Sequence, residues 1–225
     1  MRPFGEILAL AAEHKGGPFG VEAALGATPA LERSAVAAIP DDRILAEMTR
    51  RIFNAGFSSK VIEAKWPAFE AAFRGFDTRA CAFMSDEYFD ALMKDRGIVR
   101  NGAKIRSVQI NAKLVTDLAA SHGSAARFLA SWPDDDYIGL LQVLKDRGSH
   151  LSGDAGMRFL RSIGKPAFIT TKDVVAALIR EAVVDKAPSS KRDFAAVQKA
   201  FNQWSAESGH NLTEISRILA MSVEP

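Results

Sequence analysis

Two threonines and an aspartate lie close together in the stretch KPAFITTKDVV, which spans residues 165–175. A carboxylate there can stabilise a developing positive charge or act as a general base. At the start of a helix the same residues can instead bind free backbone N–H groups, and Thr170 with Asp173 matches the Thr-x-x-acid pattern of a capping box. The residues favour the helix cap and leave a catalytic role for Asp173 open.

The cysteine and the histidines do not predict a metal site. The single cysteine, Cys81, excludes a disulfide within the chain, and an ordinary zinc site would need mostly other ligands. The histidines lie far apart and have no HxxxH spacing. They are His14, His122, His150 and His210. We therefore expect no metal ion and no cofactor.

The composition is that of a globular protein. Of the 225 residues, 48% are apolar and 25% are charged, which excludes a disordered chain. The formal net charge of +2 is too small to indicate a nucleic-acid partner by itself, so local patches matter more. No signal peptide and no membrane-spanning apolar run are found. We expect a cytoplasmic protein without a membrane partner.

Apolar residues recur at helical spacing through most of the chain, as Ile44, Leu45 and Met48 do within residues 42–57. No alternating strand pattern is found, so we expect an all-α domain of eight to ten short helices. Residues 1–40 are rich in Ala and Gly and weakly patterned. We expect them to form an N-terminal extension or arm, with the main domain at 41–225. The further helices are expected within 58–75, 85–97, 101–123, 131–148, 152–164, 170–184, 189–209 and 211–222.

A tight turn between two of these helices is a candidate phosphate site. The stretch LKDRGSHLSG (144–153) ends one helix, and the next begins at Asp154. Glycines in such a turn expose backbone N–H groups at a helix N-terminus, and these groups can bind a phosphate. An ordinary helical hairpin has the same glycine pattern, so the turn can also be purely structural. Arg158 and Arg161 add positive charge nearby. The candidate DNA contacts are Arg147, Gly148, Ser149, His150 and Gly153.

A second basic segment precedes this turn. Residues 94–113 carry six basic residues and one acidic residue, which favours contact with DNA over a merely solvated face. Arg100, Lys104 and Arg106 are the candidate phosphate contacts there. The Asp134–Asp136 run, in contrast, is expected to start a helix, because carboxylates near DNA would be repelled.

The order of these segments resembles the helix-hairpin-helix DNA glycosylase superfamily. Residues 95–115 resemble the helix before the hairpin, 144–166 the hairpin with its following helix, and 167–180 the extended entry and helix that close the pocket. The stretch FNAGFSSKVIEAKWPAFEAAFRGF (53–76) is similar to the region that identifies one branch, DNA-3-methyladenine glycosylase I. The resemblance covers about residues 42–185.

The resemblance implies two helical lobes around a central cleft and a role in base excision DNA repair. Such a protein binds double-stranded DNA, flips a damaged nucleotide into a pocket and hydrolyses the N-glycosidic bond through an oxocarbenium-like sugar. No lysine matches a strand-cleaving nucleophile, so a monofunctional hydrolase is expected. We also expect the protein to be a monomer. The candidate pocket residues are Phe53, Asn54, Phe57, Ser58 and Trp66. The aromatic ones among them could stack on a flipped base, but their helical spacing in an apolar stripe favours a place in the core.

The sequence departs from this family where its acidic groups are expected. The aspartate that most of the superfamily keeps after its Gly-Pro bend falls on Thr171, whose hydroxyl cannot supply a negative charge. The methyladenine branch generally lacks that aspartate and uses an acid three positions before its Gln-Ala-Gly, which falls here on Arg51. The tryptophan after its Leu-Ser falls on Ser59. The family's terminal zinc ligands have no counterparts.

These departures leave the catalytic residue unassigned. Thr171, Asp173 and Glu63 are weak candidates, and for Glu63 a solvated helix position is favoured over a catalytic role. Two functions remain open: a glycosylase for alkylated purines of the 3-methyladenine type, and a non-catalytic helix-hairpin-helix protein that binds damaged or distorted DNA. A third is an all-α interaction domain without nucleic acid. The sequence predicts neither the lesion nor the intercalating residue.

Overall fold

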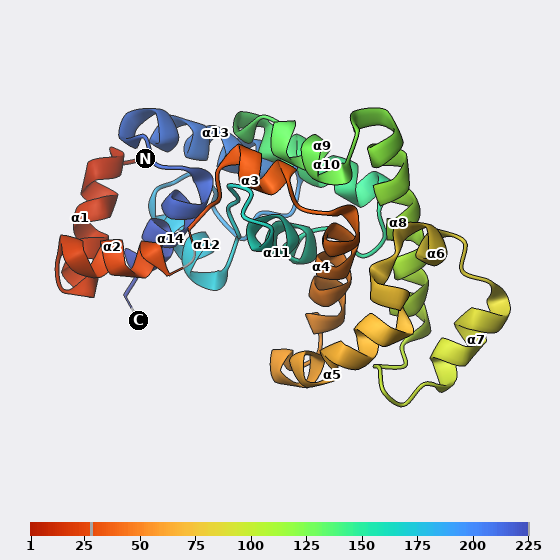
Figure 1. Cartoon of the computed structure of the whole chain (residues 1–225). Coiled ribbons are helices and arrows are strands. Elements are labelled where there is room, and N and C mark those ends of the chain that lie inside the picture. Colours follow the sequence, from red (N-terminus) through yellow and green to blue (C-terminus); the bar gives the residue numbers. More distant parts are fainter. Residues whose placement is uncertain (28, 225) are drawn as a thin grey trace. The chain divides into compact units, whose positions relative to one another are not determined.

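The computed structural model describes residues 1–27 and 29–224 and contains only helices, turns and extended segments there, with no β-strand (Figure 1). The prediction of an all-α protein is confirmed. The described residues form fourteen α-helices, more than the eight to ten expected, and two short 3-10 helices. No helix in this part of the chain is long and apolar enough to cross a membrane.

The chain divides into two compact units. Unit 1 comprises Met1–Leu31, Pro133–Gly139 and Gly164–Pro225, and unit 2 comprises Glu32–Trp132 and Leu140–Ile163. The expected boundary near residue 40 stays a prediction about domain organisation, and so does the cleft between two lobes.

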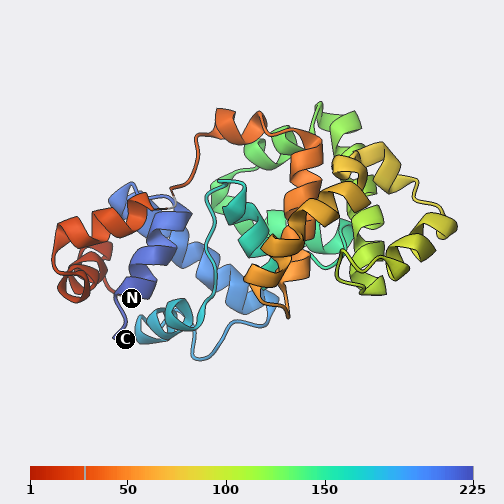
Figure 2. The ribbon, with the colours of Figure 1, turned by 60° about the horizontal axis from the view of Figure 1, so that its bottom comes forward.

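Unit 1 is built around its last helix. Figure 2 shows α1 and α2 beside α14, and α12 and α13 also pack against α14. Stacked and edge-on rings form its core, with Phe168 lying 4.6 Å from Tyr137 and 4.4 Å from Phe201 between ring centroids. The elements are α1 (Phe4–Lys15), α2 (Pro18–Gly26), η2 (Asp134–Asp136), α12 (Lys172–Arg180), α13 (Lys191–Ser208) and α14 (Leu212–Met221).

Unit 2 is centred on two long helices, α4 and α8, which pack against each other. The side chain of Asn101 accepts a hydrogen bond from Lys104 N–H and so fixes the start of α8, while the left-handed Gly123 follows its end. The elements are α3 (Arg33–Ala37), α4 (Asp41–Asn54), α5 (Ser59–Ala72), η1 (Arg74–Phe76), α6 (Thr78–Ala82), α7 (Asp86–Lys94), α8 (Gly102–His122), α9 (Ala125–Ser131) and α11 (Asp154–Ser162). α10 spans Tyr137–Arg147, with residues 140–147 in this unit.

An extended segment crosses unit 1 from residue 165 to residue 171 and is pinned by α14. The N–H of Ala167 donates to Thr213 Oγ1 at 3.0 Å, and the N–H of Ile169 donates to Ser216 Oγ at 3.2 Å. These bonds satisfy buried backbone groups that would otherwise need a neighbouring strand. The segment is therefore held extended as far as Ile169. A hydrogen bond from Thr171 N–H to Ile169 O at 2.9 Å then turns the chain before α12 begins at Lys172.

The cap of α12 differs from the sequence-based expectation. Thr171, not Thr170, is the N-cap residue, and its hydroxyl accepts a hydrogen bond from Val174 N–H at 3.3 Å. Because α14 keeps the backbone extended through Ile169, the helix starts one residue later than the capping-box pattern placed it. Asp173 lies exposed in the first turn, where a carboxylate favours the positive end of the helix.

Candidate nucleic-acid interface and base pocket

The α10–α11 turn forms the helical hairpin that the sequence indicated. Asn111 of α8 holds this turn from both sides: its Oδ1 accepts from Ser149 N–H at 2.8 Å, and its Nδ2 donates to Ser149 O at 3.1 Å. The turn also contains two positive backbone angles, with φ of 59° at His150 and 57° at Gly153. Sequence reasoning missed Asn111, although a buried asparagine on the apolar face of a helix is a usable signal.

Close packing requires a glycine at position 148, at the start of the hairpin turn. A Cβ atom on Gly148 would lie 2.6 Å from Leu144 O and 2.9 Å from Leu151 Cδ1. Carbon atoms do not approach backbone oxygen that closely, so a side chain at this position forces the turn open. The hairpin is thus a rigid element whose shape is fixed by glycine and by Asn111.

The hairpin presents basic groups to solvent. Arg147 and His150 are exposed, and His150 Nδ1 lies 3.0 Å from Ser149 Oγ. The N-cap residue of α11, Gly153, has no side chain to bind the free N–H groups of the first helical turn. Arg158 on the next turn is paired with Asp154 at 2.6 Å, so its charge is compensated locally. This combination is compatible with a phosphate, and the DNA-contacting role of the turn stays a prediction.

The C-terminal end of α4 gathers several of the predicted site residues. Lys104 Nζ of α8 donates to Ala55 O and, at 3.4 Å, to Phe53 O, at the negative end of α4. The same ammonium lies 5.0 Å from the centroid of the Phe57 ring. Burial lowers the pKa of Lys104. Lys104 is therefore engaged with α4, whereas Arg100, another predicted phosphate contact of this segment, is exposed.

The predicted pocket aromatics divide between core and surface. Phe53 is fully buried and packs edge-on against Phe69, with ring centroids 4.7 Å apart. Trp66 is 9% exposed, stacks on Phe69 and Phe76, and donates its indole N–H to Glu70 at 3.0 Å. Phe57, in contrast, is 44% exposed in the turn before α5.

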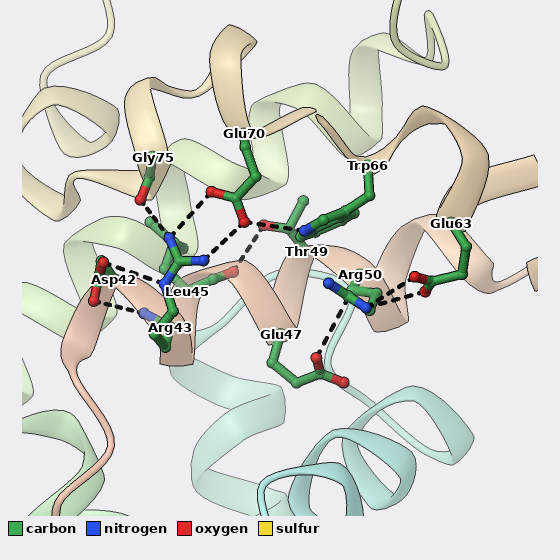
Figure 3. A network of polar contacts seen from close by, with 10 residues as sticks. All are labelled: Asp42, Arg43, Leu45, Glu47, Thr49, Arg50, Glu63, Trp66, Glu70 and Gly75. Atoms are coloured by element: carbon green, nitrogen blue, oxygen red, sulfur yellow. Dashed lines mark hydrogen bonds and ion pairs between the residues drawn. The ribbon is translucent and has the colours of Figure 1, made fainter. Parts of the chain in front are cut away.

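A polar network links α4 to α5 (Figure 3). Arg43 forms two hydrogen bonds with the Glu70 carboxylate, at 2.8 and 3.1 Å, and a third with Gly75 O at 2.7 Å. Glu70 also binds the indole of Trp66. These contacts fix the angle at which the two helices meet and therefore the position of the turn that carries Phe57.

Figure 3 also shows Glu63, the acidic candidate on α5, beside Arg50 of α4. Glu63, considered for catalysis, forms an exposed ion pair with Arg50 at 3.0 Å. Arg51, which occupies a position where the family has an acid, pairs with Glu47 at 2.6 Å. The carboxylate nearest to Arg51 on α4 thus lies one turn earlier in the helix. The Glu-x-x-x-Arg spacing was the available signal, and sequence reasoning did not use it.

The remaining predicted site residues are not brought together in one cluster. Ser58 is the N-cap residue of α5, with an exposed side chain that makes no capping hydrogen bond. Thr171 and Asp173 belong to unit 1, whereas Glu63 and the pocket candidates belong to unit 2. No cluster of three or more His, Cys, Asp or Glu side chains suited to a metal ion is present among residues 1–27 and 29–224.

The methyladenine glycosylase family model matches residues 35–143. Solved structures of 3-methyladenine DNA glycosylase I share the fold. A single-residue variant from Staphylococcus aureus is 23% identical, covering 68% of this chain and 86% of that one, with a TM-score of 0.51. A variant in complex with 3-methyladenine is 22% identical, covering 56% and 80%, with a TM-score of 0.50.

A structure of the S. aureus enzyme described as the basis of 3-methyladenine recognition is 24% identical, covering 56% of this chain and 77% of that one, with a TM-score of 0.50. The family match includes α4, α5 and α8, which carry the predicted pocket and the second basic segment. The resemblance that the sequence suggested is therefore confirmed: the chain is similar to the methyladenine glycosylase family over residues 35–143 and has the fold of 3-methyladenine DNA glycosylase I.

Proposed function

We propose that this protein is a DNA repair glycosylase that hydrolyses the N-glycosidic bond of an alkylated purine of the 3-methyladenine type. The observation that carries the proposal is the family match over residues 35–143, because it includes the pocket-bearing helices α4 and α5. The shared fold supports it. The partner is double-stranded DNA, the protein acts as a monomer, and the damaged nucleotide is rotated out of the duplex before its base is released.

The hairpin between α10 and α11 is the anchor on the DNA backbone. Arg147 and His150 are exposed at its tip, and the N–H groups at the start of α11 have no side-chain cap. Contacts of this kind position a protein on the duplex without reading its sequence. Arg100, exposed before α8, extends the positive surface of unit 2.

The turn after α4 is the place where the extrahelical base is bound. Phe57 offers an exposed ring, and a flipped base stacks on aromatic side chains at a gain of about 1–3 kcal/mol. Asn54 and the Lys104 ammonium lie at the same helix end. Phe53 and Trp66 support this site from the core rather than contacting the base.

The chemistry demands little from the protein when the leaving base is a cation. An alkylated purine that already carries a positive charge leaves as a neutral base, so protonation by a general acid is unnecessary. What remains is to orient a water molecule and to stabilise the oxocarbenium-like sugar. An exposed Asp173 and a Glu63 paired with Arg50 are the candidate carboxylates, one in each unit.

A second candidate function is supported by a specific observation. Thr171 serves as a helix cap and Arg51 is paired with Glu47, so neither position supplies a free acid. A protein of this kind that binds distorted DNA without cleaving the glycosidic bond would have the same hairpin and the same fold.

One experiment separates the two functions. Excess protein is incubated with alkylated duplex DNA, free bases are measured by chromatography, and DNA binding is measured in parallel. We expect release of 3-methyladenine. Binding without release identifies the non-catalytic function, and absence of binding contradicts both. Replacing Arg147 and His150 with alanine weakens binding if the hairpin is the anchor.

A further inference from the structure

Lys104 lies at a position that its own helix does not favour. It belongs to the first turn of α8, where the side chain of Asn101 accepts a hydrogen bond from the backbone N–H of Lys104 at 3.1 Å. A cation is unfavourable at this positive end of a helix, and burial opposes its charge as well, which lowers the pKa of the ammonium. No carboxylate of the described residues contributes to that shift. The groups that stabilise the ammonium therefore lie outside α8.

The turn after α4 provides these groups. Lys104 Nζ donates to the carbonyl oxygen of Ala55 and, at 3.4 Å, to that of Phe53. The same nitrogen lies 5.0 Å from the centroid of the exposed Phe57 ring. All of these residues belong to unit 2. One ammonium thus joins the negative end of α4 to the ring that the turn presents to solvent.

The turn has the geometry of a type II β-turn. The N–H of Phe57 donates to Asn54 O at 3.2 Å, while Ala55 has φ −65° and ψ 115°. Gly56 follows with φ 81°, a value that glycine adopts without strain. The hydrogen bond that closes the turn uses the carbonyl of Asn54. The carbonyl of Ala55, in the central peptide, is left for a partner outside the turn.

Lys104 is that partner, and its contact selects one orientation of the peptide between Ala55 and Gly56. In a type I turn the same peptide is rotated by roughly 150–180°, which would point the Ala55 carbonyl away from the ammonium. Glycine adopts the backbone angles of both turn types, so the turn residues alone do not fix the choice. Phe57 directly follows the peptide, and the position of its ring depends on that choice.

We infer that Lys104 is a positioning residue for the base site: its ammonium holds the Ala55–Gly56 peptide in one orientation and thereby keeps the Phe57 ring where an extrahelical base stacks. The inference rests on the proposed function, which takes this turn as the base site. It gives Lys104 a role in base release that acts through Phe57, without contact to the base or to a phosphate.

Fluorine NMR tests the position of the ring without requiring any activity. The full-length protein is labelled with 4-fluorophenylalanine, and the Phe57 resonance is assigned by its loss in Phe57→Leu. Lys104→Met keeps an unbranched side chain and removes the ammonium, so the Phe57 resonance should shift and narrow as the ring is released. Lys104→Arg keeps a cationic donor and should leave the resonance close to its wild-type position.

Two further variants make the spectra specific. Lys65 Nζ donates to the carbonyl oxygens of residues 96 and 97 at 2.9 and 3.0 Å, which is the same kind of contact in another loop. Lys65→Met should therefore leave the Phe57 resonance unchanged. A Cβ atom on Gly56 meets nothing within 4 Å, yet alanine disfavours the positive φ there. Gly56→Ala should shift the Phe57 resonance even though Lys104 is intact.

Single-turnover release of 3-methyladenine tests the role in base release. Lys104→Met should slow release about tenfold, as much as Phe57→Ala does. The double variant should be no slower than Phe57→Ala alone, because both changes remove the same stacking contact. Lys104→Arg should stay within about threefold of wild type, and Lys65→Met should match wild type.

An unchanged Phe57 resonance in Lys104→Met or in Gly56→Ala overturns the inference. Release at the wild-type rate in Lys104→Met also overturns it, and so does a further loss of rate in the double variant. A wild-type protein that releases no 3-methyladenine refutes the proposed enzymatic function instead, and the fluorine spectra then still decide whether Lys104 holds the ring.

Discussion

The α10–α11 hairpin and the turn after α4 are both loops of unit 2, yet they are built in opposite ways. In the hairpin, Asn111 binds the backbone of Ser149 on both sides, and Gly148 leaves no space for a side chain. At the end of α4, Phe57 is exposed and Asn54 Oδ1 is unpaired. The hairpin is rigid, which suits the proposed anchor on the DNA backbone. The turn after α4 exposes groups that can contact a ligand, which suits the proposed site for a base.

The contrast predicts that the hairpin loses the most stability when its internal bonds are removed. Asn111→Ala leaves the N–H and C=O of Ser149 unpaired, so the free energy of unfolding should fall by about 3 kcal/mol. Chemical denaturation measures this loss. Asn202→Ala, which removes an amide that donates to Asp135 O on the surface, should change stability by less than about 1 kcal/mol. Equal losses for the two variants would show that Asn111 has no special role.

Crowding at Gly148 should have the next largest effect. Alanine there places a Cβ atom 2.6 Å from Leu144 O, and the strain should cost about 2 kcal/mol of unfolding free energy. Gly5→Ala in α1 meets nothing within 4 Å and should stabilise the helix slightly, since alanine is the better helix former. Thermal unfolding of both variants measures the difference. A Gly148→Ala protein as stable as wild type would mean that the hairpin is softer than its contacts indicate.

The turn after α4 should show the reverse pattern, with function lost and stability kept. Phe57→Ala should slow release of 3-methyladenine about tenfold, because one stacking contact is worth about 1–3 kcal/mol, while the melting temperature changes little. Single-turnover release measures the effect. Phe83, which is 81% exposed in the same unit, is the matched control, and Phe83→Ala should alter neither quantity. Loss of stability with unchanged release would place Phe57 in the core instead.

The smallest effect concerns the charge on the hairpin. Arg147→Ala should weaken binding to any duplex a few-fold and reduce the slope of log affinity against log salt by about 1, as expected for one lost phosphate contact. Arg158→Ala should have less effect because Arg158 is paired with Asp154. Binding titrations over a salt series measure both slopes. An unchanged slope in Arg147→Ala would remove this residue from the DNA interface.

Helices with a strong apolar pattern were predictable from the sequence, and short ones were not. The stripe with Ile44, Leu45 and Met48 gave α4 to within a few residues, since burial of one helical face dominates there. α6 and α9 are short and rich in alanine, so their apolar periodicity is too weak to identify them. The N-terminal helices α1 and α2 are longer, and they were missed because their apolar residues are only weakly patterned.

Side-chain partners chosen by tertiary packing could not be predicted. The cap of α12 falls on Thr171 because α14, far along the chain, binds the preceding backbone through Thr213 and Ser216. The clamp by Asn111 likewise joins residues distant in sequence. The unpaired Oδ1 of Asn54 depends on what surrounds it and leaves no mark in the local sequence.

Release of 3-methyladenine from alkylated duplex DNA tests the central claim most directly. With protein in excess over lesions, a single exponential appearance of free base is expected, at a rate above that of the DNA alone. The rate of base release should fall in Phe57→Ala and should equal the wild-type rate in Phe83→Ala. A protein that binds the duplex yet leaves the rate of base loss at the spontaneous level would contradict the enzymatic function.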